Sequence, residues 1–201
     1  MDVTASKHQP TRAFNLANVL TYSRIAAVPV VVACMYWSEI LQGGLLLRWI
    51  ALAIFIAAGI TDILDGYVAR MWSQQSSLGR MLDPIADKLL VSSCLLMLAA
   101  DGTIRGWSLW AAIIILCREI LVSGLREYLA ELRVSVPVTQ LAKYKTTAQL
   151  IAIGFLIAGE AGDEIFAYTT LTGLTLLWAS ALLTLYTGWD YMRAGLRHIE
   201  D

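Results

Sequence analysis

The stretch DILDGYVARMWSQQSSLGRMLDPIAD, residues 62–87, places four aspartates at helical spacing on the two sides of a polar connection. Asp62 and Asp65 are three positions apart, and Asp83 and Asp87 are four apart, so each pair lies on one face of a helix. The connection is short enough for the two helices to pack as neighbours. The spacing therefore predicts four carboxylates that converge at one end of a helix pair.

Apolar residues dominate the rest of the chain. The 201 residues are 58% hydrophobic and 15% charged, whereas a soluble domain carries roughly a quarter charged residues. The apolar residues collect in runs, most of which reach the roughly 17 residues needed to cross a bilayer. We therefore predict one integral membrane domain, residues 1–201, with an all-α fold of six transmembrane helices. The predicted spans are 20–41, 45–67, 84–100, 107–129, 146–160 and 165–189.

The polar segments outside these spans indicate the orientation. Most lysines and arginines fall in the N-terminus, the second and fourth connections and the C-terminus, whereas the opposite side holds only Arg48 and Arg105. Basic residues accumulate on the cytoplasmic side, so both termini and the aspartates are predicted to be cytoplasmic, in a protein of the cytoplasmic membrane. Residues 11–19, TRAFNLANV, fit a short interfacial helix and a polar lead-in about equally well.

Four converging carboxylates need a compensating charge. Like charges within a few ångströms repel each other, and a bound divalent cation removes that repulsion. Oxygen ligands suit magnesium, manganese or calcium rather than zinc. The alternative is that the aspartates cap helices and pair with Arg70, Arg80 and Lys88. That alternative suits a single aspartate better than a spaced set at the edge of a span, where ionisable groups are costly. The set therefore predicts a metal site.

Small and basic residues accompany the aspartates. Gly66, Ala69 and Gly79 follow on the same helix faces, where small side chains let a neighbouring helix or a bulky ligand approach the backbone. Arg70 is placed to hold phosphate oxygens. Pro84 is expected in the first turn of the third transmembrane helix, where its missing N–H removes no hydrogen bond.

The pattern DxxDGxxAR…GxxxDxxxD, which residues 62–87 match at every fixed position, resembles the signature of the CDP-alcohol phosphatidyltransferase family. The resemblance implies that two divalent ions, Mg²⁺ or Mn²⁺, hold the pyrophosphate of a CDP-linked lipid. It also implies that an alcohol attacks the lipid-bearing phosphate in line and that CMP is released. The expected partners are CDP-diacylglycerol, membrane lipid and a second copy of the chain in a homodimer, with no nucleic acid.

The same resemblance assigns roles to the residues of the motif. It implies that Asp87 is the general base and also a ligand. The implied metal ligands are Asp62, Asp65, Asp83 and Asp87, and the implied CDP-lipid-binding residues are Gly66, Ala69, Arg70 and Gly79.

A second group of basic residues lies on the fourth and fifth spans. Arg118 lies well inside the fourth span, Arg126 lies near its cytoplasmic end, and Lys143 and Lys145 precede the fifth. A buried arginine is costly and arginine suits bidentate phosphate binding, so we predict an anion pocket that faces the aspartates. For Arg118, the alternative is an arginine–glutamate pair that joins helices.

The sequence around these residues resembles that of the phosphatidylglycerophosphate synthase branch of the family. The matching segments are REI at 118–120 and KYKTT at 143–147. The similarity implies sn-glycerol 3-phosphate as the acceptor, with its phosphate at Arg118, Arg126, Lys143 and Lys145. Asn18, Thr21 and Arg24 share one helical face and are candidates for the nucleotide or lipid-phosphate site, or for an N-cap and an interfacial anchor.

Two other functions stay open at this point. A member of the same family can use another acceptor, such as inositol phosphate, serine or phosphatidylglycerol, and an uncharged acceptor would not need the basic group. A small cation transporter would use the aspartates to bind its ion, but it would also need acidic residues along a path across the bilayer.

Overall fold

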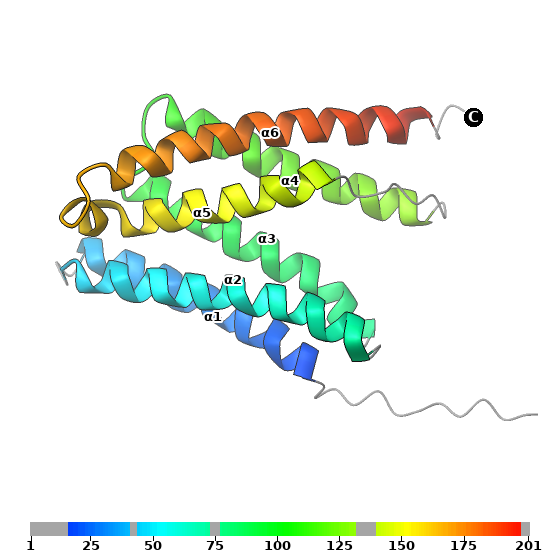
Figure 1. Ribbon diagram of the computed structural model, residues 1–201, viewed down its shortest axis with the longest axis horizontal. Helices are drawn as coiled ribbons and strands as arrows, with labels where there is room; N and C mark the ends of the chain where they lie inside the picture. Colours follow the sequence, from blue (N-terminus) through cyan, green and yellow to red (C-terminus); the bar gives the residue numbers. More distant parts are fainter. Residues whose placement is uncertain (1–15, 41–43, 73–76, 132–139, 198–201) are drawn as a thin grey trace, which may run out of the picture.

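The computed structural model describes residues 16–40, 44–72, 77–131 and 140–197. Side chains are described for residues 18–38, 44–62, 81–130, 144–189 and 191–193. The described residues form six helices and no strand, so the all-α fold is confirmed, and each predicted span corresponds to one helix (Figure 1). The helices are α1 (Leu16–Ile40), α2 (Leu46–Trp72), α3 (Ser77–Ala100), α4 (Ser108–Glu131), α5 (Gln140–Asp163) and α6 (Thr169–Arg197).

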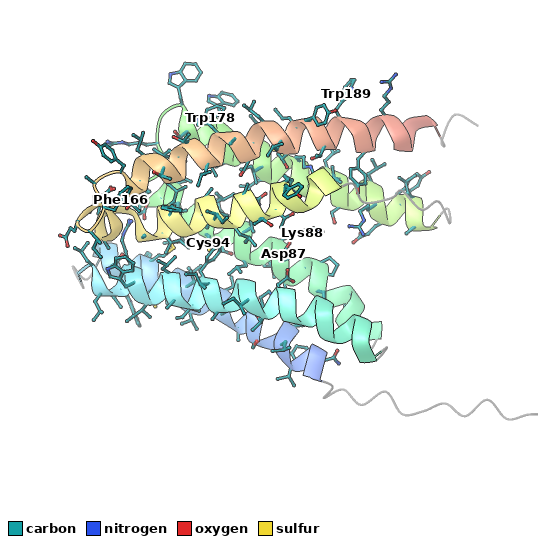
Figure 2. The ribbon with its side chains drawn as sticks, viewed as in Figure 1. Asp87, Lys88, Cys94, Phe166, Trp178 and Trp189 are labelled. Carbon is teal, nitrogen blue, oxygen red and sulfur yellow. The ribbon has the colours of Figure 1, made fainter. Side chains whose placement is uncertain are left out.

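Three of these helices are long and apolar enough to cross a membrane by themselves: Asn18–Ser38 in α1, Ser108–Ala130 in α4 and Thr169–Arg193 in α6. Large apolar side chains also point away from the bundle, as at Ile120 and Leu182, which are 69% and 63% exposed. Figure 2 shows Trp189 projecting outward from α6 in the same way. Such exposure is costly in water and favourable in lipid, which makes this a membrane protein.

The helices form two groups. Helices α1, α2 and α3 pack together, while α6 packs against both α4 and α5. The two groups meet through α2 and α5 and through the crossing of α3 with α4 and α5 (Figure 1). Helix α1 begins and helix α6 ends at the same end of the bundle, where α2 ends and α3 begins.

A buried ion pair closes the opposite end of the bundle. Arg48, near the start of α2, lies 2.6 Å from Asp101 in the α3–α4 turn, and both side chains are less than one-tenth exposed. The same guanidinium donates a hydrogen bond to Thr103 at 3.3 Å. Helix α5 makes room for this arginine by a kink at Gly159, which has φ 44° and ψ −126°. An L side chain rarely adopts that conformation.

The beginning of α3 differs from the expectation. The helix starts at Ser77, so Pro84 lies inside it, and the prediction of a first-turn proline is wrong. One backbone hydrogen bond is therefore lost beside Asp83, a loss that helices in membranes tolerate when neighbouring groups compensate. Residues 16–19 of the proposed interfacial segment are the first turn of α1, and residues 11–15 lie outside the described residues.

Candidate functional site

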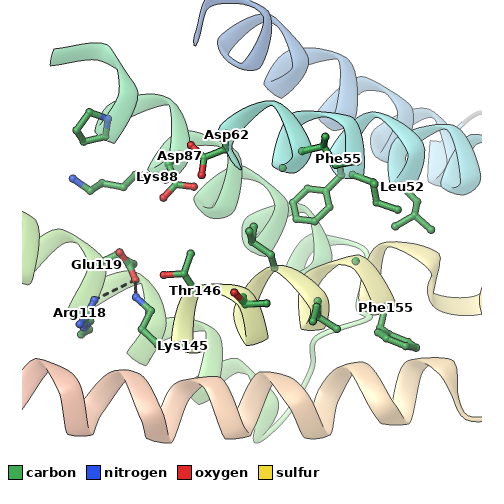
Figure 3. A pocket seen from close by; sticks show the side chains of 18 of the residues that line it. Leu52, Phe55, Asp62, Asp87, Lys88, Arg118, Glu119, Lys145, Thr146 and Phe155 are labelled. Carbon is green, nitrogen blue, oxygen red and sulfur yellow. Dashed lines mark hydrogen bonds and ion pairs between the residues drawn. The ribbon is translucent and has the colours of Figure 1, made fainter. Parts of the chain in front are cut away.

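A cavity of about 1260 Å³ separates the two helix groups. At one end its walls carry charged side chains: Asp62 and Asp87 lie on one side, and Glu119 and Lys145 face them from the other (Figure 3). Away from this end the walls are apolar, as at Phe55. The cavity is therefore amphipathic along its length.

The aspartates line the charged end from two helices. Asp62 comes from α2, and Asp83 and Asp87 come from successive turns of α3. Asp87 is within electrostatic range of Asp62. Three of the four carboxylates thus line one cavity. Asp65 belongs to α2, but its side chain lies outside the described residues.

Helix α1 supports two of these carboxylates from behind. Arg24, whose side chain is 1% exposed, lies 2.8 Å from Asp62 between Nη1 and Oδ1. Thr21 donates a hydrogen bond from Oγ1 to Asp83 Oδ1, and Asn18 is buried one turn earlier. None of these three α1 residues lines the cavity. Thr21 and Arg24 therefore contact the aspartates rather than the open space. The proposed contact of these three residues with the nucleotide or the lipid phosphate stays a prediction.

The donor set fits a hard divalent cation. Three carboxylates line one cavity, all their donors are oxygens, and two of the carboxylates are fixed by partners on α1. Among the side chains that the structure describes, which leave out Asp65, no three potential ligands lie close enough together to enclose one ion. The metal site stays a prediction.

The opposite wall carries the basic residues Arg118, Arg126 and Lys145, which we call the basic wall. Arg126 and Lys145 face the cavity from α4 and α5. Lys143 belongs to α5, with its side chain outside the described residues. The basic residues do face the aspartates across one cavity, as the anion-pocket prediction requires.

Arg118 is engaged by the protein itself. Its Nε donates to the Thr184 carbonyl at 3.2 Å, and its Nη2 donates to Thr187 Oγ1 at 3.1 Å, both on α6. Its Nη1 lies 3.4 Å from Glu119 Oε1. The ion pair with Glu119 lies within α4, so Arg118 joins α4 to α6 through its hydrogen bonds to Thr184 and Thr187 rather than through that pair.

The residues of the motif that are predicted to bind the nucleotide lie on the expected helices. Gly66, Ala69 and Arg70 belong to α2, and Gly79 belongs to the first turn of α3. Their side chains lie outside the described residues, so their roles stay predictions.

The structure adds site residues that sequence reasoning missed. Lys88, which follows Asp87, donates a hydrogen bond to Ser123 and so links α3 to α4 beside the carboxylates. Glu119 lies between two members of the basic wall (Figure 3). A single acidic residue next to an arginine has no spacing that sets it apart from an ordinary ion pair, so the sequence held little signal for it.

The apolar part of the cavity suits hydrocarbon. Leu52 and Phe55 of α2 face Phe155 of α5, and the small residues Gly59 and Gly154 keep the space between the two helices open. A site with carboxylates and cations at one end and a long apolar groove beyond them is suited to a ligand with a charged head and a lipid tail.

Comparisons with known proteins agree with this geometry. The family model for CDP-alcohol phosphatidyltransferase matches residues 14–186. Several curated proteins named CDP-diacylglycerol–glycerol-3-phosphate 3-phosphatidyltransferase are similar to the chain. The protein from Rickettsia bellii is 44% identical over 180 residues, covering 90% of this chain and 94% of the relative. The protein from Cereibacter sphaeroides is 37% identical, with 94% and 98% covered, and that from Escherichia coli is 34% identical, with 94% and 98% covered.

Proposed function

This chain belongs to the CDP-alcohol phosphatidyltransferase family, and we propose that it transfers the phosphatidyl group of CDP-diacylglycerol to sn-glycerol 3-phosphate with release of CMP. The names of its relatives support the donor and the acceptor. The observation that carries the proposal is that one cavity contains all three features: carboxylates on one wall, the basic wall opposite them, and an apolar part beyond both. Such a cavity admits a phosphorylated alcohol and a two-chain lipid together.

We propose that Asp62, Asp65, Asp83 and Asp87 hold divalent metal, Mg²⁺ or Mn²⁺. The metal, when bound, supplies the positive charge that neutralises the pyrophosphate and the departing CMP. Arg24 contacts Asp62 and Thr21 contacts Asp83, so α1 orients two of these carboxylates. This preorganisation reduces the rearrangement that binding requires.

Asp87 is the proposed general base. Its carboxylate lines the cavity between the other aspartates and the basic wall, so it can take the proton from the attacking hydroxyl. The hydroxyl oxygen then forms a bond to the phosphorus that carries diacylglycerol. The bond from that phosphorus to the CMP oxygen breaks, and CMP leaves with the electron pair.

The basic wall is the proposed binding site for the acceptor's phosphate. Lys145 and Arg126 offer their positive charges to the cavity directly, whereas Arg118 is held by α6 and contributes charge from a fixed position. Lys143 is proposed as a further contact. An acceptor with a phosphate gains from this wall, and serine or another unphosphorylated alcohol does not.

The membrane arrangement is also part of the proposal. All six helices cross the cytoplasmic membrane, and both termini and the aspartates lie on its cytoplasmic side, where CDP-linked donors and phosphorylated acceptors are available. The concentration of basic residues in the same segments supports this orientation. The family resemblance supports a homodimer.

The deciding experiment measures CMP release by the purified protein from CDP-diacylglycerol with Mg²⁺ or Mn²⁺. The acceptors are glycerol 3-phosphate, inositol phosphate, serine and phosphatidylglycerol. We expect release that needs both glycerol 3-phosphate and metal, and a loss of at least about a hundredfold in Asp87→Asn. Release with another acceptor would assign the chain to a different branch of the family. Folded protein that releases no CMP with any acceptor would leave the cation-transport alternative.

A further inference from the structure

Glu119 places a carboxylate in the middle of the basic wall. Its Oε1 accepts contacts from two cations, Arg118 Nη1 at 3.4 Å and Lys145 Nζ. The side chain is 20% exposed and lines the cavity. A carboxylate among phosphate-binding cations weakens an anion site unless it has a second task, because it repels the phosphate.

The contacts around Glu119 form a chain that is anchored on α6. Thr184 and Thr187 accept hydrogen bonds from the Arg118 guanidinium. The same guanidinium forms an ion pair with Glu119, and Glu119 forms a second ion pair with Lys145. Gly188 allows this arrangement, because a Cβ at that position would lie 3.1 Å from Arg118 Cγ. The orientation of the Glu119 carboxylate is therefore fixed by two neighbouring cations, one of which is itself held by α6.

The second oxygen of Glu119 remains available. Both contacts go to Oε1, and no described side chain hydrogen-bonds or pairs with Oε2. Glu119 is within electrostatic range of Asp87, and the two residues line both the main cavity and a small recess beside it. Figure 3 shows the two carboxylates on facing walls, with Lys145 next to Glu119. A small molecule can thus reach Asp87, Glu119 and Lys145 at once.

We propose that Glu119 is a specificity-determining residue that accepts, through Oε2, a hydrogen bond from a second hydroxyl of the acceptor. The inference rests on the proposed function and names the class of acceptor more narrowly. The phosphate binds Lys145 and Arg126, the attacking hydroxyl meets Asp87, and the neighbouring hydroxyl meets Glu119. A short phosphorylated polyol satisfies all three contacts. An acceptor without the second hydroxyl leaves the Glu119 carboxylate without a hydrogen-bond donor. An acceptor that carries a carboxylate in place of that hydroxyl is repelled by Glu119.

The test compares two acceptors that differ by one hydroxyl: sn-glycerol 3-phosphate and 3-hydroxypropyl phosphate. The intact protein should prefer glycerol 3-phosphate by about a hundredfold in kcat/KM, the size expected of a hydrogen bond to a charged group. In Glu119→Gln this preference should fall below about tenfold. The fall should come from slower use of glycerol 3-phosphate, with little change for the deoxy acceptor or in the KM for CDP-diacylglycerol.

Glu164→Gln is the matched control. It removes an equivalent charge from an exposed position in the α5–α6 turn, and it should keep the full preference. A preference below threefold in the intact protein would overturn the inference, and so would an equal loss of both activities in Glu119→Gln. These outcomes leave the proposed function standing, because that function fails only if glycerol 3-phosphate itself supports no release of CMP.

Discussion

Single contacts from α1 determine where two of the candidate metal ligands lie. Thr21 is 1% exposed, and its hydroxyl donates to Asp83, while the ion pair between Arg24 and Asp62 fixes the neighbouring helix. Neither α1 residue lines the cavity. Their expected effect is on how well the carboxylates bind an ion, because partners behind a ligand orient it and tune its affinity.

We predict that Thr21→Val raises the metal concentration needed for half-maximal CMP release by about tenfold or more. Valine keeps the shape of threonine but cannot donate to Asp83. A magnesium titration of the activity measures the effect. Thr175→Val is the control, because Thr175 is exposed and its hydroxyl donates only to the Leu171 carbonyl of its own helix in the described residues. An unchanged titration in Thr21→Val would argue against metal binding at Asp83.

Gly59 lies at the passage between the charged and apolar parts of the cavity. It precedes Asp62 by one helical turn, lines the cavity, and has no atom within 4 Å of the position that a Cβ would take. A large side chain therefore fits the fold but occupies the space that we assign to a lipid chain.

We expect Gly59→Phe to raise the KM for long-chain CDP-diacylglycerol by about tenfold, with a smaller effect on the KM for a dioctanoyl donor and on the KM for glycerol 3-phosphate. Initial rates with the two donors measure the difference. Gly124→Phe on α4 is the control, because Gly124 also has open space at its Cβ but does not line the cavity. Equal effects of Gly59→Phe on both donors would place the lipid chains elsewhere.

Among the described helices, α5 is distinguished by a kink, at which Arg48 of α2 links it to the α3–α4 turn. The positive φ of Gly159 bends the helix where the Arg48 guanidinium enters, and Arg48 reaches Asp101 in the α3–α4 turn. A Cβ at residue 159 would lie 2.0 Å from Arg48 Nη1. Backbone conformation and space thus both require glycine here.

Gly159→Ala should lower the free energy of unfolding by roughly 2 to 4 kcal/mol, the combined cost of backbone strain and overpacking. Thermal unfolding in detergent should show a midpoint several degrees lower. Gly154→Ala on the same helix is the control, since its Cβ would meet Leu52 at 3.7 Å, an ordinary contact. If both variants had the same unfolding midpoint as the wild-type protein, the kink would have no role in stability.

Different polar groups lie toward the two ends of the six-helix bundle. Asp62 lies in the later half of α2, and Asp83 and Asp87 lie in the first half of α3, so all three are nearer the end at which α1 begins and α6 ends. The opposite end carries the Arg48–Asp101 ion pair and the turns before α4 and α6. The proposed orientation places the first end in the cytoplasm and the second outside.

Cysteine labelling tests this orientation. In a background without Cys34, Cys94 and Cys117, we expect Trp107→Cys and Ile165→Cys to react with an impermeant thiol reagent in intact cells. These positions are 82% and 77% exposed, in the turns before α4 and α6.

Arg193→Cys, an exposed position near the end of α6, should react only in inverted membrane vesicles. The reverse pattern would invert the proposed orientation. Labelling of the cysteines at positions 165 and 193 from the same side would show that α6 does not cross the membrane.

The fold class, the metal-ligand candidates and the family could all be predicted from the amino-acid sequence. Apolar runs can be recognised locally, because a bilayer imposes a minimum length on each span. Asp62, Asp83 and Asp87 could be recognised because helical spacing is also local, and the structure brings them to one cavity as expected. The local pattern failed at Pro84, because apolar run length does not show where a helix begins before the membrane.

The contacts between groups on different helices could not be predicted in this way. Thr21 and Asp83 are 62 positions apart, and Arg118 and Thr187 are 69 apart, so their contacts depend on how α1 packs on α3 and α4 on α6. The same packing turned Arg118 toward α6 and placed Glu119 in the lining of the cavity. Helical periodicity shows which face a residue occupies, but the partner of that face depends on long-range packing that no short stretch of sequence contains.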